Sequence, residues 1–158
     1  MKDYTKILHE ILEKRILVLD GAMGTIIQGY NFSEEDYRGN RFKDYEYPLK
    51  GNNDLLSITQ PKAIKEIHES FLQAGADIIE TNTFSSTTVA MADYHMEDLV
   101  YELNFESAKI AVGACKKFTD KNPQKPRFVA GSIGPTIKQH PCHLMLMILD
   151  SEPLLLMS

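Results

Sequence analysis

The sequence predicts an α/β fold in which parallel strands are joined by helices. Short apolar runs alternate four times with segments of helical period, and three of the runs end in polar or glycine-rich clusters. The runs are centred on residues 16–19, 55–58, 76–79 and 128–130. Ligands of such folds bind beyond the carboxyl ends of the strands. We therefore expect a site where Asp20-Gly21, the Glu80–Thr83 cluster and Gly131–Pro135 meet.

Length and composition are ordinary for a soluble globular domain. The chain has 158 residues, of which 43% are apolar and 25% charged, so it is long enough to bury a core. A net charge of −5 without an extended basic stretch argues against a nucleic-acid partner. No apolar run approaches membrane-spanning length and the N-terminus lacks the pattern of a secretion signal, so we expect a cytoplasmic protein that binds no membrane. Cys115 and Cys142 are expected to stay thiols.

The first predicted elements lead directly to a candidate site. An amphipathic helix over 4–14 precedes a buried strand at Ile16–Leu19, and an ordered aromatic excursion over 28–51 follows. Between them, Asp20 suits an amine, and Gly21 and Gly24 can adopt a positive φ and leave N–H groups open for a carboxylate. The pair suits an amino acid. The alternative stays open that Asp20 only caps the next turn and the glycines only fit the backbone.

The middle of the chain supplies packing helices. A stripe at three- and four-residue spacing predicts a helix from Pro61, with Gly75 as its left-handed end. His68 on that stripe is expected at the edge of the core rather than as a ligand. A second helix near 98–118 carries Cys115, which we interpret as a small buried hydrophobe. The glycines at 21 and 24 follow G-x-x-G rather than G-x-G-x-x-G, which disfavours nucleotide binding.

Five motifs carry a resemblance to a known family. In order, they are L-D-G-A-M-G-T at 19–25, K-G-N-N-D-L-L at 50–56, A-G-A-D-I-I-E-T-N-T-F at 74–84, S-T-T-x-A-M-A-D-Y at 86–94 and V-A-G-S-I-G-P-T at 129–136. Together they resemble the homocysteine S-methyltransferase family, and most closely the homocysteine-binding module of cobalamin-dependent methionine synthases. The resemblance implies that residues 1–136 are the truncated N-terminal half of a (β/α)8 TIM barrel.

The resemblance also implies a chemistry. In that family branch a zinc-bound homocysteine thiolate accepts a methyl group from methylcobalamin to give methionine, and folate and cobalamin modules recharge the cofactor from 5-methyltetrahydrofolate. The implied substrate-binding residues are Asp20, Gly21, Ala22, Met23 and Gly24, which would hold the amino-acid end, and Glu80, Asn82 and Thr83, which would line the same mouth. The family's zinc cysteines belong to later strands, and Cys115 matches no ligand position. We therefore expect no metal site, no catalytic residue and no activity from this chain alone.

Residues 137–158 depart from the family pattern. A coding string for the family's usual continuation, read one base out of phase, reproduces this tail and then supplies a stop codon, so we interpret it as an out-of-frame product. His140, Cys142 and His143 are then no designed metal site. The alternative is a stand-alone α/β amino-acid-binding module whose Met- and Leu-rich tail serves for docking.

Overall fold

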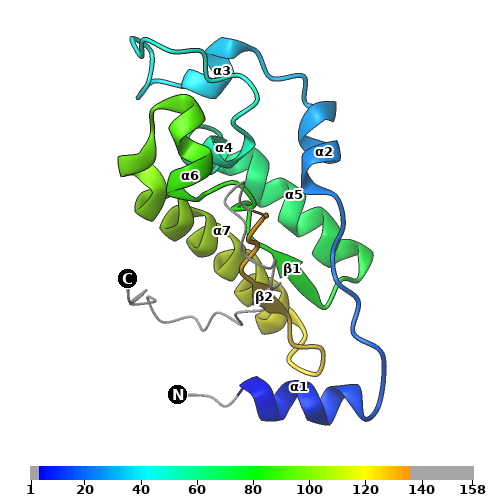
Figure 1. The fold of residues 1–158 in the computed structure, drawn as a ribbon. Helices are drawn as coiled ribbons and strands as arrows, with labels where there is room; N and C mark the ends of the chain where they lie inside the picture. The colour runs from blue at the N-terminus through cyan, green and yellow to red at the C-terminus, as the bar shows by residue number, and fades with distance from the viewer. Residues whose placement is uncertain (1–3, 136–158) are drawn as a thin grey trace.

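The computed structural model describes residues 4–135, which form a helix-rich chain around a small parallel sheet (Figure 1). The main helices are α1 (Tyr4–Leu12), α2 (Met23–Gly29), α3 (Glu34–Arg38), α4 (Leu56–Thr59), α5 (Pro61–Ala74), α6 (Thr88–Met91) and α7 (Val100–Lys121). Short 3-10 turns η1 (Asn53–Leu55), η2 (Ala92–Tyr94) and η3 (Glu97–Leu99) join them. The tail assigned to 137–158, with His140, Cys142 and His143, lies outside the described residues.

The sheet confirms two of the four predicted strands. β1 (Ile78–Glu80) and β2 (Phe128–Ala130) pair in parallel, with Ile79 opposite Val129. The long helix α7 lies between them in sequence, as a parallel crossover requires. The prediction of an α/β chain with parallel pairing is therefore confirmed, although residues 4–135 contain a small sheet rather than a barrel.

The first predicted strand is present only as a bridge. Leu19 pairs in parallel with Ile78, and the N–H of Asp20 donates to the carbonyl of Ile78 over 2.9 Å. The expectation that this strand is buried was wrong, because Ile16 is 85% and Val18 53% exposed. The backbone pairs with β1 on one side, but its side chains are left facing outward.

The predicted strand at 55–58 was also wrong, because these residues form η1 and α4. The side-chain oxygen of Asn52 accepts the N–H of Leu55 over 3.3 Å and so starts the helical turn. Leu55, Leu56 and Ser57 are all buried, so neither a helical nor a strand period appears in the apolar pattern. A short apolar run of this kind does not distinguish a strand from a buried helix.

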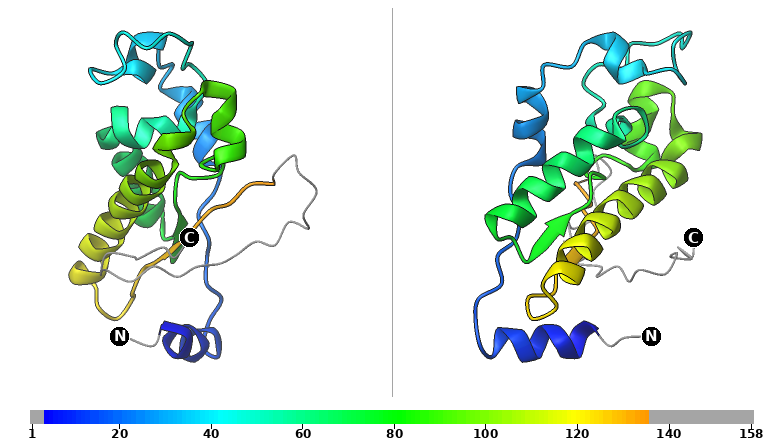
Figure 2. Two further views of the ribbon diagram at one scale, coloured as in Figure 1. Left: turned by 60° about the vertical axis from the view of Figure 1, so that its left-hand side comes forward. Right: turned by 180° about the vertical axis from the view of Figure 1, so that it is seen from behind.

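Helices α5 and α7 lie side by side and cover one face of the sheet (Figures 1 and 2). Leu72 of α5 and Ala111 of α7 pack in one cluster with Ile79 and Val129 of the strands. As predicted, α5 begins at a proline and ends at Gly75, which has a φ of 116°. These two helices fix the direction of the strands and so the edge at which their carboxyl ends lie.

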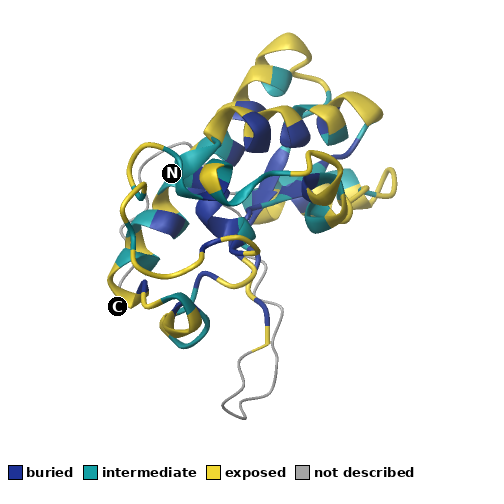
Figure 3. Cartoon of the chain, turned by 90° about the horizontal axis from the view of Figure 1, so that it is seen from above, coloured by how far each residue is buried: buried dark blue, intermediate teal, exposed yellow. Residues whose placement is uncertain are grey.

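A second cluster packs the segments beyond those carboxyl ends. It joins α2, the excursion after it, α4 and the first part of α7, and its buried members include Ile27, Leu49, Leu56 and Leu103. The predicted ordering of the excursion is confirmed, since buried Tyr37 donates to Oδ1 of Asn53 over 2.7 Å. Buried residues line the junctions between helices and sheet (Figure 3). Within residues 4–135, the helices fall short of the length and apolarity needed to cross a membrane.

Candidate functional site

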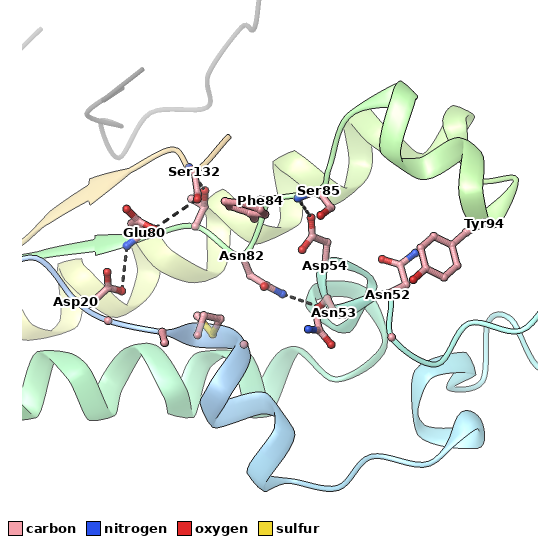
Figure 4. A pocket seen from close by; sticks show the side chains of 16 residues that line it. Asp20, Asn52, Asn53, Asp54, Glu80, Asn82, Phe84, Ser85, Tyr94 and Ser132 are labelled. Carbon is pink, nitrogen blue, oxygen red and sulfur yellow. Dashed lines mark hydrogen bonds between the residues drawn. The ribbon is translucent and has the colours of Figure 1, made fainter. Parts of the chain in front are cut away.

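A cavity of about 500 Å³ opens beyond the carboxyl end of β1 (Figure 4). Four short segments line it, 20–24, 51–54, 80–82 and 84–85, together with Tyr94 and Ser132. Each segment lies next to a helix or strand that packs in one of the two apolar clusters described above. The location agrees with the strand-end site expected for a parallel fold.

Two acidic side chains meet at one end of the cavity. Oδ2 of Asp20 accepts the backbone N–H of Glu80 over 3.0 Å. Burial raises the pKa of the Asp20 carboxyl to about 7; the Glu80 N–H opposes this rise, and the negative charge of Glu80 adds to it. The hydroxyl of Ser132 donates to Oε2 of Glu80 over 3.5 Å. This end can therefore accept a cationic group.

The glycine-containing loop lies beside that acidic end. Gly21 and Gly24 both line the cavity, and neither uses the positive φ that glycine allows. A Cβ at Gly21 would meet the Phe71 ring at 3.5 Å, which is an ordinary contact. Met23 and Gly24 are the first two residues of α2, so their N–H groups have no acceptor within the helix. The loop thus offers backbone donors without backbone strain.

The far end of the cavity is built from a hydrogen-bonded pair of segments. Oδ2 of Asp54 accepts the N–H of Ser85 over 2.7 Å and the hydroxyl of Ser86 over 2.9 Å. Burial raises the pKa of the Asp54 carboxyl against the effect of these two bonds. The side-chain amide of Asn82 donates to the carbonyl of Asn53 over 2.8 Å. These bonds hold the segments after β1 and before α4 together.

The structure brings most of the predicted site residues to one cavity. Its lining includes Asp20, Gly21, Ala22, Met23, Gly24, Glu80 and Asn82. Thr83 does not line the cavity; it is buried, and its hydroxyl donates to the carbonyl of Ser132 over 2.8 Å.

Eight lining side chains were not among the predicted substrate-binding residues. They are Asn52, Asn53, Asp54, Thr81, Phe84, Ser85, Tyr94 and Ser132. Asn52, Asn53 and Asp54 follow Gly51 in the sequence and precede the buried apolar run at Leu55. A polar run at that position is the sequence signal that could have identified them as lining residues. Tyr94 reaches the cavity from η2, and no local pattern marks it as a lining residue.

The described residues do not fit the zinc centre that the resemblance implies. Across 4–135, no three His, Cys, Asp or Glu side chains gather as a metal site. The Cys115 thiol donates to the carbonyl of Phe128 over 3.3 Å, and burial raises its pKa to about 12. It therefore lacks thiolate character, which confirms its packing role. His68 is fully buried rather than at the core edge.

Comparison with known proteins gives consistent results. The family model described as homocysteine S-methyltransferase matches residues 17–145. The oxidised form of the homocysteine methyltransferase MmuM from Escherichia coli is 27% identical, with a TM-score of 0.63 over 81% of this chain and 40% of that one. Its metallated form is 26% identical, with a TM-score of 0.62 over 81% and 41%. The chain therefore spans about two fifths of the length of these structures and matches a fragment of their fold.

Proposed function

Since the chain belongs to the homocysteine S-methyltransferase family, we propose that its cavity holds homocysteine as the acceptor of a methyl group. The observation that carries this proposal is the acidic end formed by Asp20 and Glu80 beside the backbone donors of 21–24. An amino acid presents an ammonium and a carboxylate on one carbon. The cavity offers complementary groups to both, side by side.

The geometry at Asp20 supports its assignment to the substrate ammonium. Oδ2 already accepts the N–H of Glu80, which leaves Oδ1 as the acceptor for a ligand. The same bond fixes the orientation of the carboxylate, so little side-chain freedom is lost on binding. Ala22, Met23 and Gly24 are proposed to donate backbone N–H groups to the substrate carboxylate. Asn82 is proposed to shape the cavity, because its amide already bonds within the protein.

We further infer that the chain derives from a cobalamin-dependent methionine synthase. The five sequence motifs support this narrower assignment. The methyl donor would then be methylcobalamin, recharged from methyltetrahydrofolate on folate and cobalamin modules. Because the described residues do not fit a zinc site, we assign zinc to other parts of the full-length family fold and no reaction step to this chain.

A stand-alone amino-acid-binding module is the second candidate. Within the described residues, the lining of the cavity runs from Asp20 to Ser132. This candidate predicts amino-acid binding without methyl transfer from any donor in any larger assembly. The proposed methyltransferase origin predicts that binding is selective for homocysteine.

Titration calorimetry of the purified chain with L-homocysteine tests the proposal. We expect saturable binding that Asp20→Ala abolishes, with Asp93→Ala, an exposed carboxylate on η2, as the matched control. Methionine formation with zinc and methylcobalamin supplied is expected to equal a no-protein control. Equal binding of homocysteine, serine and alanine would favour the stand-alone module, and absence of homocysteine binding would contradict the proposal.

A further inference from the structure

Phe84 is an aromatic side chain placed at the cavity but left open to solvent. It lines the cavity and is 57% exposed, in contrast to its buried neighbour Thr83. It follows β1 in a segment rich in hydrogen bonds, so its exposure is not that of a loose loop. An aromatic ring on a fixed backbone offers a large apolar contact area to a ligand in the cavity.

Gly134 fixes the ring from one side. The N–H of Gly134 donates to the carbonyl of Phe84 over 2.8 Å. A Cβ at position 134 would lie 2.6 Å from that carbonyl oxygen and 2.7 Å from Cε1 of the ring. Only glycine leaves room for both the ring and the bond, so residue 134 acts as the support on which Phe84 lies.

Asp54 fixes the same segment from the other side, since its carboxylate accepts the N–H of Ser85. Phe84 is thus held at both ends. In Figure 4 its ring lies between the Asp20–Glu80 end and the Asp54–Tyr94 end of the cavity. The labelled side chains around it are mostly polar, so the ring supplies an apolar wall to a cavity that is otherwise suited to charged groups.

We propose that Phe84 is a specificity-determining residue whose ring contacts the methylene carbons and sulfur of the amino-acid substrate, and that Gly134 is its positioning residue. This inference rests on the proposed binding of homocysteine. An apolar wall favours a thiol-bearing side chain over a hydroxyl-bearing one of the same length, because the hydroxyl loses more hydration on contact. The cavity should therefore discriminate homocysteine from homoserine.

Calorimetry with these two ligands tests the wall. Phe84→Ala should weaken homocysteine binding about tenfold and homoserine binding much less. Phe84→Leu should restore most of the discrimination, because it retains an apolar side chain. Gly134→Ala should reproduce the loss of discrimination, and should add little to it in the Phe84→Ala background. Phe105→Ala, on α7 and 36% exposed, is the matched aromatic control and should bind both ligands like the unaltered chain.

A second readout uses the absence of tryptophan from the sequence. Phe84→Trp would carry the sole indole of the chain, and its emission should change on titration with homocysteine. Phe105→Trp should show no change. Both variants retain an aromatic ring, so this measurement remains informative if Phe84→Ala does not fold.

The outcomes separate the two proposals. If the unaltered chain binds homocysteine while Phe84→Ala keeps the full homocysteine-to-homoserine ratio and Phe84→Trp stays silent, the wall is overturned and the proposed substrate stands. If the unaltered chain does not bind homocysteine, the proposed substrate is overturned together with the wall. Loss of discrimination in Phe84→Ala, together with an emission change in Phe84→Trp, supports both.

Discussion

Oδ2 of Asp20 accepts the backbone N–H of Glu80 over 3.0 Å, and this bond joins the loop before α2 to the end of β1. The bond brings two carboxylates to one end of the cavity. Burial then raises the pKa of the Asp20 carboxyl to about 7, so its charge changes near neutral pH. Ligand binding and folding should both depend on this group.

We expect amino-acid binding to strengthen as the pH rises from 6 to 8. The substrate ammonium binds the charged carboxylate, which is formed above a pKa of about 7. Homoserine is the suitable ligand for this titration, because its hydroxyl does not ionise in the range. Asp20→Asn should bind weakly and without a pH dependence between 6 and 8. A pH profile that Asp20→Asn shares would assign the titration to another group.

The same group should make folding less favourable as the pH rises. Its folded pKa lies above the ordinary value of 3.8, so the folded state binds more protons between pH 3.8 and about 7. The contribution of Asp20 to the free energy of unfolding therefore declines through that window. Urea titrations should show that Asp20→Asn removes this decline. An unchanged slope in the variant would contradict the raised pKa.

Asp54 should contribute more to stability than an exposed carboxylate. Asp54→Ala would leave the N–H of Ser85 and the hydroxyl of Ser86 without their acceptor, at a cost of about 1–3 kcal/mol. Asp54→Asn retains one acceptor oxygen and should cost less. Chemical denaturation is the measurement, with Asp93→Ala as the exposed control. Equal losses at the two aspartates would show that these hydrogen bonds contribute little.

Elements of this fold that depend on neighbouring residues could be predicted from the sequence, whereas those that depend on contacts between distant residues could not. The strands near Ile79 and Val129 and the helix ending at Gly75 were predictable, because apolar runs and a left-handed cap are local signals. The run at Leu55–Leu56 was not, because it is short and is buried together with Ser57, so it shows no period that separates helix from strand. The prediction of a buried strand at Ile16–Leu19 was wrong for a related reason, since an apolar run does not reveal whether another element covers it.

The site shows the same division. The loop from Asp20 to Gly24 was predictable because polar residues follow an apolar run, and the structure places it on the cavity. Phe84 was not, because its position depends on Gly134, which the chain brings beside it only after α7 and β2 have formed. The hydrogen bond between the Phe84 carbonyl and the Gly134 N–H therefore depends on the tertiary structure and not on a local sequence pattern.

His68 should make the chain sensitive to mild acid. It is fully buried, burial lowers its pKa to about 4, and neither ring nitrogen has a hydrogen-bond partner in the part of the chain that the structure describes. The unfolded chain, with an ordinary pKa of 6.5, binds the proton first, so stability falls as the pH drops from 6.5 to 4. At pH 5 the loss from this group is about 2 kcal/mol.

His68→Leu tests this directly. The variant should be more stable than the unaltered chain at pH 5 and should gain less at pH 7, as measured by urea denaturation. His9→Leu, at an exposed position on α1, is the control and should leave the pH dependence in place. If His68→Leu instead lowers the stability equally at pH 5 and pH 7, the packing of the ring matters more to stability than the cost of burying it.

The exposed edge at 16–19 should govern aggregation. Ile16 is 85% and Val18 53% exposed, although the backbone beside them pairs with β1. An uncovered apolar edge of a sheet is a template for pairing with another chain, and a lysine on it blocks such pairing. We expect Ile16→Lys and Val18→Lys to raise the soluble yield while changing the free energy of unfolding by no more than about 0.5 kcal/mol. Tyr101→Lys removes a 61% exposed ring from α7, away from the edge, and should raise the yield less. An equal gain from Tyr101→Lys would mean that total exposed apolar area, not the strand edge, drives association.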